Sequence, residues 1–518
     1  MTTVTRPLVR RLAAALSGGV LLAAAAGAAL AGEVWPVEQT AVDATEVPVA
    51  ATAVAQVCPG PPRLATAVAG EDLGYDEFDP EGSGTRSALD VLTLGREDQP
   101  PGGLQLLPTL AAAEAEDVTL SGAARLAHRD DVGEAAVLRA EPSDGTVAFA
   151  AGTSVALTET GDLRGLTAAS CQPPATSAWL VGGSTEPGNS AQLVLSNAGD
   201  TPASATLTGW GSTGPLDLST AGAVLVPPGG QRVVLLESLS ADPRPAVHVE
   251  VTGGEVTAVV QDSRLRGLVP AGTDLISPGT APARTVVLPG IFLGETSGEG
   301  ADAPAVRIVN PGEEPVTARL ELLGADGVTP VPGADALVVD PGAVVDVSLE
   351  GMPLGAWTAV VSADGPVTGA AVVTTVGRPG EDDPGTAPVD RAWVPATAGV
   401  SSGLVAVPAE LVTRANLVVA NPSSSTVEVE LVPVLRDGTR AEPVSRTLGA
   451  RTSLLEDVSA LAEDVAAVEV QAREGAVHAT LMLTATVPDG GLMSAVPLTE
   501  DPHAARAVTL APAPAPLG

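Results

Sequence analysis

The sequence predicts an all-β protein made of about four tandem immunoglobulin-like β-sandwich units that follow an N-terminal transmembrane or signal helix. Short runs of Val, Leu, Ile and Thr alternate with turns of Gly, Pro, Asn and Asp along most of the chain. This alternation is typical of strands joined by tight turns. Similar segments also recur about 110 residues apart, and roughly seven short strands fit in one such period, which suits a two-sheet sandwich.

The first 31 residues have the features of a membrane anchor or a signal peptide. Three arginines within the first eleven residues precede twenty uncharged residues, 12–31. A helix of that length extends about 30 Å, enough to cross a bilayer, and its basic flank predicts that the rest of the chain lies outside the cell. The run ends in Ala29-Leu30-Ala31, a suitable cleavage site. We therefore expect a single-pass cell-membrane protein with its ectodomain outside, or a secreted protein if the segment is cleaved.

Residues 32–57 are expected to form a linker that ends in a first strand, and residues 58–176 a divergent sandwich unit. Cys58 and Cys171 bracket this unit and lie 113 residues apart. An even number of cysteines in an exported chain favours a disulfide. If the first and last strands of the unit lie side by side, the disulfide closes it and adds about 5 kcal/mol in the chain-entropy model. The alternative is two unrelated buried thiols.

Three clearer repeats are expected at residues 177–283, 284–390 and 391–512, before a disordered tail at 513–518. Each repeat opens alike, with the segments SAWLVGG, RTVVLPG and RAWVPAT. A structural turn is expected at three corresponding asparagines, Asn197, Asn310 and Asn421, which are 113 and 111 residues apart. A period this long indicates a string of domains, each with its own core, rather than a solenoid of small stacked units.

The charge of the chain excludes some partners. The formal net charge is -36, and all 26 basic residues are arginine. A surface this acidic repels phosphate backbones, so nucleic acid is not expected as a partner. Contact with the membrane is expected only through the N-terminal helix.

The residues that usually carry chemistry are sparse or scattered. The four histidines are far apart in sequence, which does not match metal-ligand spacing: His128, His248, His478 and His503. His248 and Glu250 share one face of a predicted strand and either bind a metal weakly or face solvent. One loop is rich in acids, but their spacing is not that of a dedicated calcium loop, so a solvated loop is preferred: Asp72, Asp76, Glu77, Asp79 and Glu81. We assign no catalytic, metal or cofactor-binding residue and expect no cofactor.

Aromatic side chains offer few surfaces for binding sugars. Four tryptophans align with apolar positions in other repeats and are therefore expected in the core: Trp179, Trp210, Trp357 and Trp393. Only Tyr75 and Phe78, on the acidic loop, are expected to be available for stacking against a ligand.

Three segments carry a resemblance to a known family. They are SAWLVGGSTEPGNSAQLVLSNAGDTPASATLTGWGSTGP at 177–215, VPPGGQRVVL at 226–235 and AVHVEVTGGEVTAVVQDSRLRG at 246–267. With the cysteine segments VCPGPPRL and ASCQPP, they resemble the actinobacterial domain-of-unknown-function 5719 family. The resemblance implies an exported, membrane-associated envelope protein with no assigned activity.

We therefore expect a non-catalytic structural or interaction protein of the actinobacterial cell envelope. Its expected partner is an envelope protein or a wall polysaccharide. The alternative function is a glycan-associated accessory factor in envelope polysaccharide biogenesis, which exposed aromatics on one sandwich face would favour. A hydrolase is a third possibility, and two close carboxylates in a cleft would favour it.

Overall fold

The computed structural model describes residues 45–46, 51–64, 84–96, 99–380, 385–502 and 509–510. The chain divides into a small unit, 1–49 with 507–518, and a large compact unit, 50–506. In the small unit, β1 (Thr45–Glu46) pairs antiparallel with β37 (Thr509–Leu510). The expected helix and signal segment at 1–31, like the tail at 513–518, lies outside the described residues. None of the helices that the structure describes is long and apolar enough to span a membrane.

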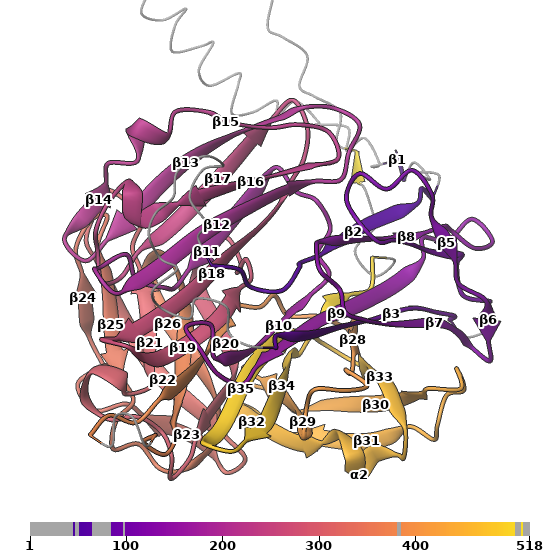
Figure 1. Cartoon of the computed structure of the whole chain (residues 1–518). Coiled ribbons are helices and arrows are strands. Elements are labelled where there is room, and N and C mark those ends of the chain that lie inside the picture. The colour runs from indigo at the N-terminus through magenta and orange to yellow at the C-terminus, as the bar shows by residue number, and fades with distance from the viewer. Residues whose placement is uncertain are drawn as a thin grey trace, which may run out of the picture. The chain divides into compact units, whose positions relative to one another are not determined.

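The described residues form an all-β fold of antiparallel sheets, as predicted (Figure 1). The N-terminal unit, β2 to β10, contains two sheets. The first has the strand order β2 (Val54–Cys58), β8 (Ala136–Ala140), β4 (Leu104–Leu107) and β5 (Glu116–Asp117). The second has the order β10 (Gly165–Ser170), β9 (Phe149–Thr158), β3 (Arg86–Leu94), β7 (Ala124–Asp130) and β6 (Leu120–Ser121).

Repeat 1 also has two sheets. Its first sheet has the order β11 (Ser177–Val181), β17 (Ala246–Thr252), β13 (Ala203–Gly211) and β14 (Gly214–Leu216), and β15 (Val224–Val226) also pairs with β13. Its second sheet has the order β16 (Gly230–Leu235), β12 (Asn189–Asn197), β18 (Thr257–Arg266) and β19 (Val269–Ile276). Two short 3-10 turns, η2 (Ser219–Ala221) and η3 (Leu236–Ser238), connect strands.

Repeat 2 has the same strand order, but one long strand, β26 (Gly355–Val376), takes part in both layers. The first layer contains β20 (Ala283–Leu293), β22 (Val316–Gly324), β23 (Gly327–Pro330) and β24 (Leu337–Val339). The second contains β25 (Val344–Ser348), β21 (Ala305–Val309) and β27 (Val389–Pro395), and the 3-10 turn η4 (Gly300–Asp302) precedes β21.

Repeat 3 completes the large unit. Its first sheet has the order β31 (Val444–Leu448), β30 (Val427–Leu435), β33 (Val465–Ala472), β28 (Ser402–Ala406) and β36 (Thr499–Glu500). Its second has the order β32 (Thr452–Asp457), β29 (Arg414–Asn421), β34 (His478–Val487) and β35 (Gly490–Pro497). The single-turn helix α2 (Val458–Leu461) follows β32, and the Asp457 side chain accepts a hydrogen bond from Ser459 N at its start.

The expected boundary between repeats 2 and 3, at 390/391, is wrong. It divides β27, which pairs along its whole length with β26 of repeat 2. The segment RAWVPAT is therefore the last strand of repeat 2 and not the opening strand of repeat 3. The boundary was predicted from the similarity between SAWLVGG and RAWVPAT, which are both short apolar segments with tryptophan at the third position.

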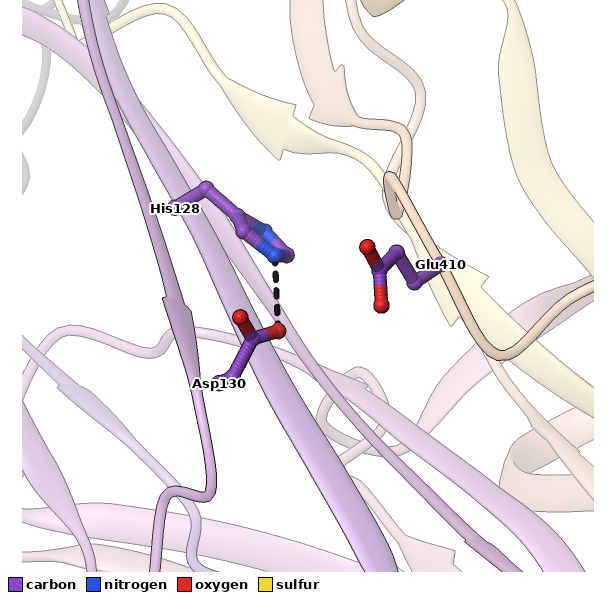
Figure 2. A group of neighbouring side chains, drawn as sticks. All are labelled: His128, Asp130 and Glu410. Atoms are coloured by element: carbon purple, nitrogen blue, oxygen red, sulfur yellow. Dashed lines mark hydrogen bonds and ion pairs between the residues drawn. The ribbon is translucent and has the colours of Figure 1, made fainter.

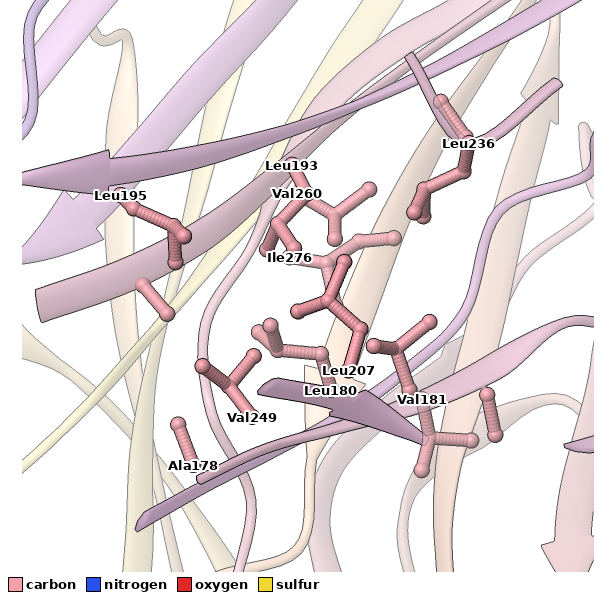
Figure 3. Packing of buried hydrophobic residues seen from close by; sticks show 14 of the residues in the cluster. Ala178, Leu180, Val181, Leu193, Leu195, Leu207, Leu236, Val249, Val260 and Ile276 are labelled. Atoms are coloured by element: carbon pink, nitrogen blue, oxygen red, sulfur yellow. The ribbon is translucent and has the colours of Figure 1, made fainter. Parts of the chain in front are cut away.

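Alternating apolar residues build the core between the two sheets of each repeat. In repeat 1, Leu193 and Leu195 on β12 face Leu207 and Val249 on the opposite sheet, and all four are at most 8% exposed (Figure 3). Burial of one such side chain stabilises the fold by about 1.5–3 kcal/mol. The outer face of β13 is exposed at alternate positions, as expected for an antiparallel sheet with one solvated face.

Some strands of the second sheets, such as β21, are buried on both faces because neighbouring units share cores. On β21, Val306 and Ile308 pack inside repeat 2, whereas Ala305 and Val309 pack against repeat 1. Repeat 3 contacts repeat 2 in the same way, with Val418 on β29. The length of the repeat predicted a string of domains, each with its own core. The structure shows that neighbouring units also pack against one another, so they are not independent domains on a string.

The contacts between units form a closed cycle. The second sheet of the N-terminal unit packs against repeat 3, through residues such as Leu166 and Ala168. Repeat 1 returns to the N-terminal unit, where the side-chain amide of Gln261 donates to Arg63 O at 2.6 Å. Each unit thus has a neighbour on either side, and the last contacts the first.

Four strands, one from each unit, meet where these contacts converge; we call β10, β19, β27 and β35 the central strands. Polar side chains link them in order. Asp274 Oδ2 on β19 accepts from Trp393 N on β27 at 2.7 Å, and Asp390 Oδ2 on β27 accepts from Met493 N on β35 at 2.6 Å. Ser494 Oγ on β35 then accepts from Ala168 N on β10 at 2.9 Å. These buried hydrogen bonds fix the register between units.

Candidate functional site

The structure places the two cysteines together, in a disulfide within the core of the N-terminal unit, where each is 1% exposed. The first strand and the segment after the last one also lie side by side. Val57 N donates to Gln172 O at 2.7 Å, and Gln172 N donates to Val57 O at 2.9 Å. This is the arrangement that a closing disulfide requires.

The three asparagines occupy equivalent turns. The side chain of Asn197 donates to Thr201 O at 2.8 Å and accepts from Gly199 N at 2.9 Å. Asn310 and Asn421 each bond in the same way to the carbonyl four residues on and to the amide two residues on. All three are at most 1% exposed, so their role here is structural.

Several candidates from the sequence do not form a site. The acidic loop with Tyr75 and Phe78, and His503, lie outside the described residues. His248 Nε2 lies 2.8 Å from Ser177 Oγ, and its ring stacks on Trp179 with a centroid distance of 4.2 Å. Trp210 and Trp393 are buried as expected, at 7% and 3% exposed. Trp179 and Trp357, which were also expected in the core, are only half-buried.

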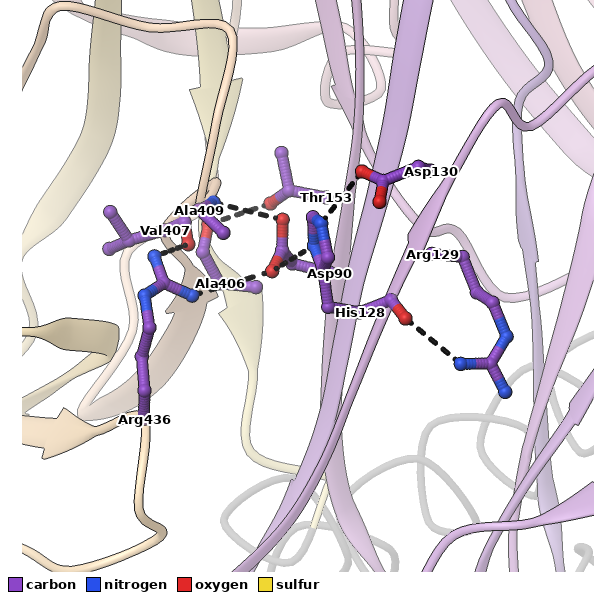
Figure 4. Close-up of polar contacts among 9 residues, drawn as sticks. All are labelled: Asp90, His128, Arg129, Asp130, Thr153, Ala406, Val407, Ala409 and Arg436. Atoms are coloured by element: carbon purple, nitrogen blue, oxygen red, sulfur yellow. Dashed lines mark hydrogen bonds and ion pairs between the residues drawn. The ribbon is translucent and has the colours of Figure 1, made fainter.

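A polar cluster lies between the N-terminal unit and repeat 3. His128 on β7 has both ring nitrogens in contact with carboxylates: Nδ1 is 3.0 Å from Asp90 and Nε2 is 2.9 Å from Asp130 (Figure 4). Asp90 also accepts from Ala409 N of repeat 3 at 3.1 Å and pairs with Arg436 at 3.5 Å. The cluster therefore ties the two units together.

The same cluster has donors for a cation. Ligand atoms of His128, Asp130 and Glu410 lie within 4.8 Å of one another, and the Glu410 carboxylate faces the other two from a different segment (Figure 2). However, the hydrogen bond that His128 donates to the Asp90 carboxylate raises the pKa of His128 to about 9. A protonated imidazole cannot ligate a metal. An ion-paired contact therefore fits this cluster better than a metal centre at neutral pH.

We expect His128 to titrate well above the usual range of histidine. In an NMR titration of the ring signals, its pKa should be raised towards 9, and Asp90→Asn should lower it. The sign for stability follows from linkage: the contribution is present below pH 6.5 and is lost as the pH rises towards 9. A His128 pKa near 6.5 in the native protein would contradict the ion-paired assignment. Asp130→Asn, at an exposed position, is the control and should lower the pKa of His128 less than Asp90→Asn does.

A second polar site is a cavity of about 360 Å³ between repeats 1 and 2, which we call the junction cavity. Its walls combine four arginines with four acids: Arg244, Arg264, Arg307, Arg391, Glu186, Asp262, Asp302 and Asp346. Trp393 also lines it. Cavities of a few hundred cubic ångströms are of the size that holds small ligands.

Arg307 forms the best-ordered part of the cavity. Its guanidinium makes a two-bond fork with Asp346, at 2.9 and 3.0 Å, and donates to Gly183 O of repeat 1 at 2.8 Å. It also lies 5.0 Å from the ring centroid of Trp393. The side chain is 5% exposed, so the cavity has a rigid, charged floor.

Two further acids in the wall, Asp302 and Asp262, also form ion pairs or hydrogen bonds. Asp302 pairs with Arg266 at 2.8 Å and with Arg391 at 3.3 Å. Asp262 accepts from the indole Nε1 of Trp393 at 2.8 Å, and burial raises its pKa. Asp262, Asp302 and Asp346 therefore hold the wall together, and none of the three is placed as a free general base.

The fold and these sites define a repeated all-β protein with charged junctions between its units. The chain matches the model of a family of unknown function (DUF5719) over residues 126–455, and it belongs to that family. The resemblance seen in the sequence is thereby confirmed. The search of curated proteins found no match.

A solved structure titled "Biofilm associated protein - BSP domain" aligns with the chain at 10% sequence identity. The alignment covers 90% of this chain and 99% of that chain, with a TM-score of 0.14. A TM-score this low does not establish a shared fold.

Proposed function

We propose that this chain is a non-catalytic, extracytoplasmic interaction protein of the actinobacterial cell envelope, built from immunoglobulin-like sandwich units. The N-terminal segment would anchor it to the membrane or direct its secretion. The observation that best supports a binding role is the junction cavity, in which Asp262, Asp302 and Asp346 are each engaged by arginine or tryptophan. Such a wall holds a ligand but has no residue poised to transfer a proton.

The buried central carboxylates fit this proposal better than they fit a hydrolase. Asp274 and Asp390 influence each other's charge, and burial raises the pKa of both. However, each accepts a backbone hydrogen bond from the next unit. Their role as links between units explains their burial, whereas glycoside hydrolysis needs its carboxyl groups to flank a substrate.

The second candidate function is a glycan-associated accessory factor. The junction cavity favours it, because polar groups converge on a space of small-ligand size. Aromatic platforms do not add to this argument: among the described residues, Phe292 is the one aromatic side chain that is strongly exposed, at 42%. The two candidates share a binding role and differ in the partner, which is either an envelope protein or a wall polysaccharide.

Co-sedimentation with cell-wall sacculi separates these candidates. Residues 33–518 would be mixed with actinobacterial sacculi before and after removal of the attached polysaccharide. Binding that is lost on stripping would identify the glycan-associated function. Absence of binding in both cases would favour a protein partner, and turnover of the polysaccharide by the purified chain would contradict the non-catalytic proposal.

A further inference from the structure

The repeats provide an internal comparison for the junction cavity. Arg307 lies three residues before the turn asparagine of repeat 2. Val194 and Val418 occupy the same position in repeats 1 and 3. Val418 packs in the apolar junction between repeats 2 and 3. A valine therefore suffices to pack this position of the fold, and the arginine is not required for packing.

Two charged positions on β18 are also uncharged in the other repeats. By strand register, Asp262 and Arg264 correspond to Val373 and Thr375 in repeat 2. In repeat 3 they correspond to Leu483 and Ala485. Uncharged residues thus serve at these positions in both other repeats. Because replacing buried ion pairs by apolar residues is often neutral or stabilising, packing alone does not account for this concentration of charge.

Two arginines of the cavity are not held by direct bonds in the way that Arg307 is. The Arg264 side chain makes no direct hydrogen bond or ion pair with any residue that the structure describes, and its charge acts on the buried carboxylate of Asp262. The Nε of Arg244 is buried without a hydrogen-bond partner among the same residues. Arg307, by contrast, already binds Asp346. A buried donor without a partner destabilises the fold, so a ligand that accepts this hydrogen bond would remove an existing penalty.

We propose that the junction cavity binds a small ligand with an anionic phosphate or carboxylate group, held by Arg264 and Arg244. Guanidinium groups bind both anions through paired N–H donors. Arg307 and Trp393 form the rigid floor behind the anion, and Glu186 lies at the exposed rim. In a chain with a net charge of -36, this local placement of arginine makes the cavity a distinct point for anion binding.

This inference deepens the proposed function, since an acidic sugar on an envelope polymer is one carrier of such a group. Isothermal titration calorimetry with the purified chain tests it. The probes are inorganic phosphate, glucose 6-phosphate and glucuronate, with glucose as the uncharged control. We expect one-to-one binding of at least one anion, weakened by added salt, and no comparable binding of glucose. The anion that binds assigns the phosphate or the carboxylate class.

Variants locate the site. Arg264→Gln should weaken anion binding about tenfold or more, because it removes a charge-assisted hydrogen bond. Arg414→Gln, an exposed arginine of repeat 3, is the matched control and should leave binding unchanged. Thermal unfolding of both variants should stay close to that of the native chain, because Arg264→Gln breaks no direct hydrogen bond or ion pair and removes only the electrostatic interaction with Asp262.

These experiments distinguish failure of the anion site from failure of the proposed envelope function. If no anion binds, or if Arg264→Gln and Arg414→Gln behave alike, the anion site is wrong even when the chain still sediments with sacculi. If an anion binds at Arg264 but the chain binds no envelope material, the site stands and the envelope function fails.

Discussion

Replacing Cys58 and Cys171 together by alanine is expected to lower the free energy of unfolding of the N-terminal unit by about 3–5 kcal/mol. The disulfide joins residues 113 apart in sequence, and a cross-link over a long loop removes much conformational entropy from the unfolded chain. Alanine avoids placing new hydroxyl groups in a core where both sulfurs are buried.

Hydrogen–deuterium exchange of β2 and β8 is the appropriate measurement, because a protein of several units does not unfold in one step. Exchange in these strands should accelerate strongly in the double variant. The native chain in reductant should approach the behaviour of the variant, which controls for packing changes. If the protection of β2 and β8 changes by less than about 1 kcal/mol, the disulfide is not a main support of this unit.

The second large effect is on the dependence of stability on pH. Burial raises the pKa of Asp390 to about 8, compared with 3.8 for a free aspartate. Between these values the folded protein keeps a proton that the unfolded chain releases, so stability falls as the pH rises from about 4 to about 8. One such group contributes at most about 1.4 kcal/mol per pH unit.

Asp390→Asn should therefore behave differently at the two ends of this range. At pH 5 its stability should be close to that of the native chain, because asparagine still accepts the hydrogen bond from Met493 N. At pH 8 the variant should be more stable, by about 4 kcal/mol at most. Urea unfolding at both pH values measures this difference.

The stability of the Asp390→Asn variant should still fall somewhat as the pH rises. Burial also raises the pKa of Asp274, and deprotonation of His128 lowers the stability further at higher pH. Asp326→Asn, at an exposed position in the turn between β22 and β23, is the matched control and should not change the profile. If Asp390→Asn is no more stable than the native chain at pH 8, the carboxyl group is not held neutral at the centre.

Local sequence features were sufficient to predict the strands and turns. Apolar alternation before Asn197, Asn310 and Asn421 identifies β12, β21 and β29, because strand residues point alternately to the two faces. The Cys58 to Cys171 spacing matched the period of the repeat, and the disulfide follows from it. These features depend on neighbours within one unit.

The junctions could not be predicted in the same way. Asp262 and Arg264 look like solvent-facing charges in an alternating strand, but in the fold they line a cavity that repeat 2 closes, with Trp393 bonded to Asp262. Asp90, His128 and Glu410 come from three distant segments, so no spacing in sequence brings them together. One signal was available for the cavity: Arg307 stands where the other two repeats have valine. The boundary between repeats 2 and 3 was wrongly placed at 390/391 because the pairing of β27 with β26 is a tertiary contact that the local sequence does not reveal.

Photo-crosslinking in living cells tests most directly whether this protein binds envelope material at the junction cavity. A benzophenone amino acid would replace Glu186 at the cavity rim, and Arg414 as the control. We predict an adduct with envelope material at position 186 that is absent at 414 and is reduced by Arg264→Gln in the same chain. Full-length protein at the envelope without a position-186 adduct, or with equal adducts at both positions, would contradict this account.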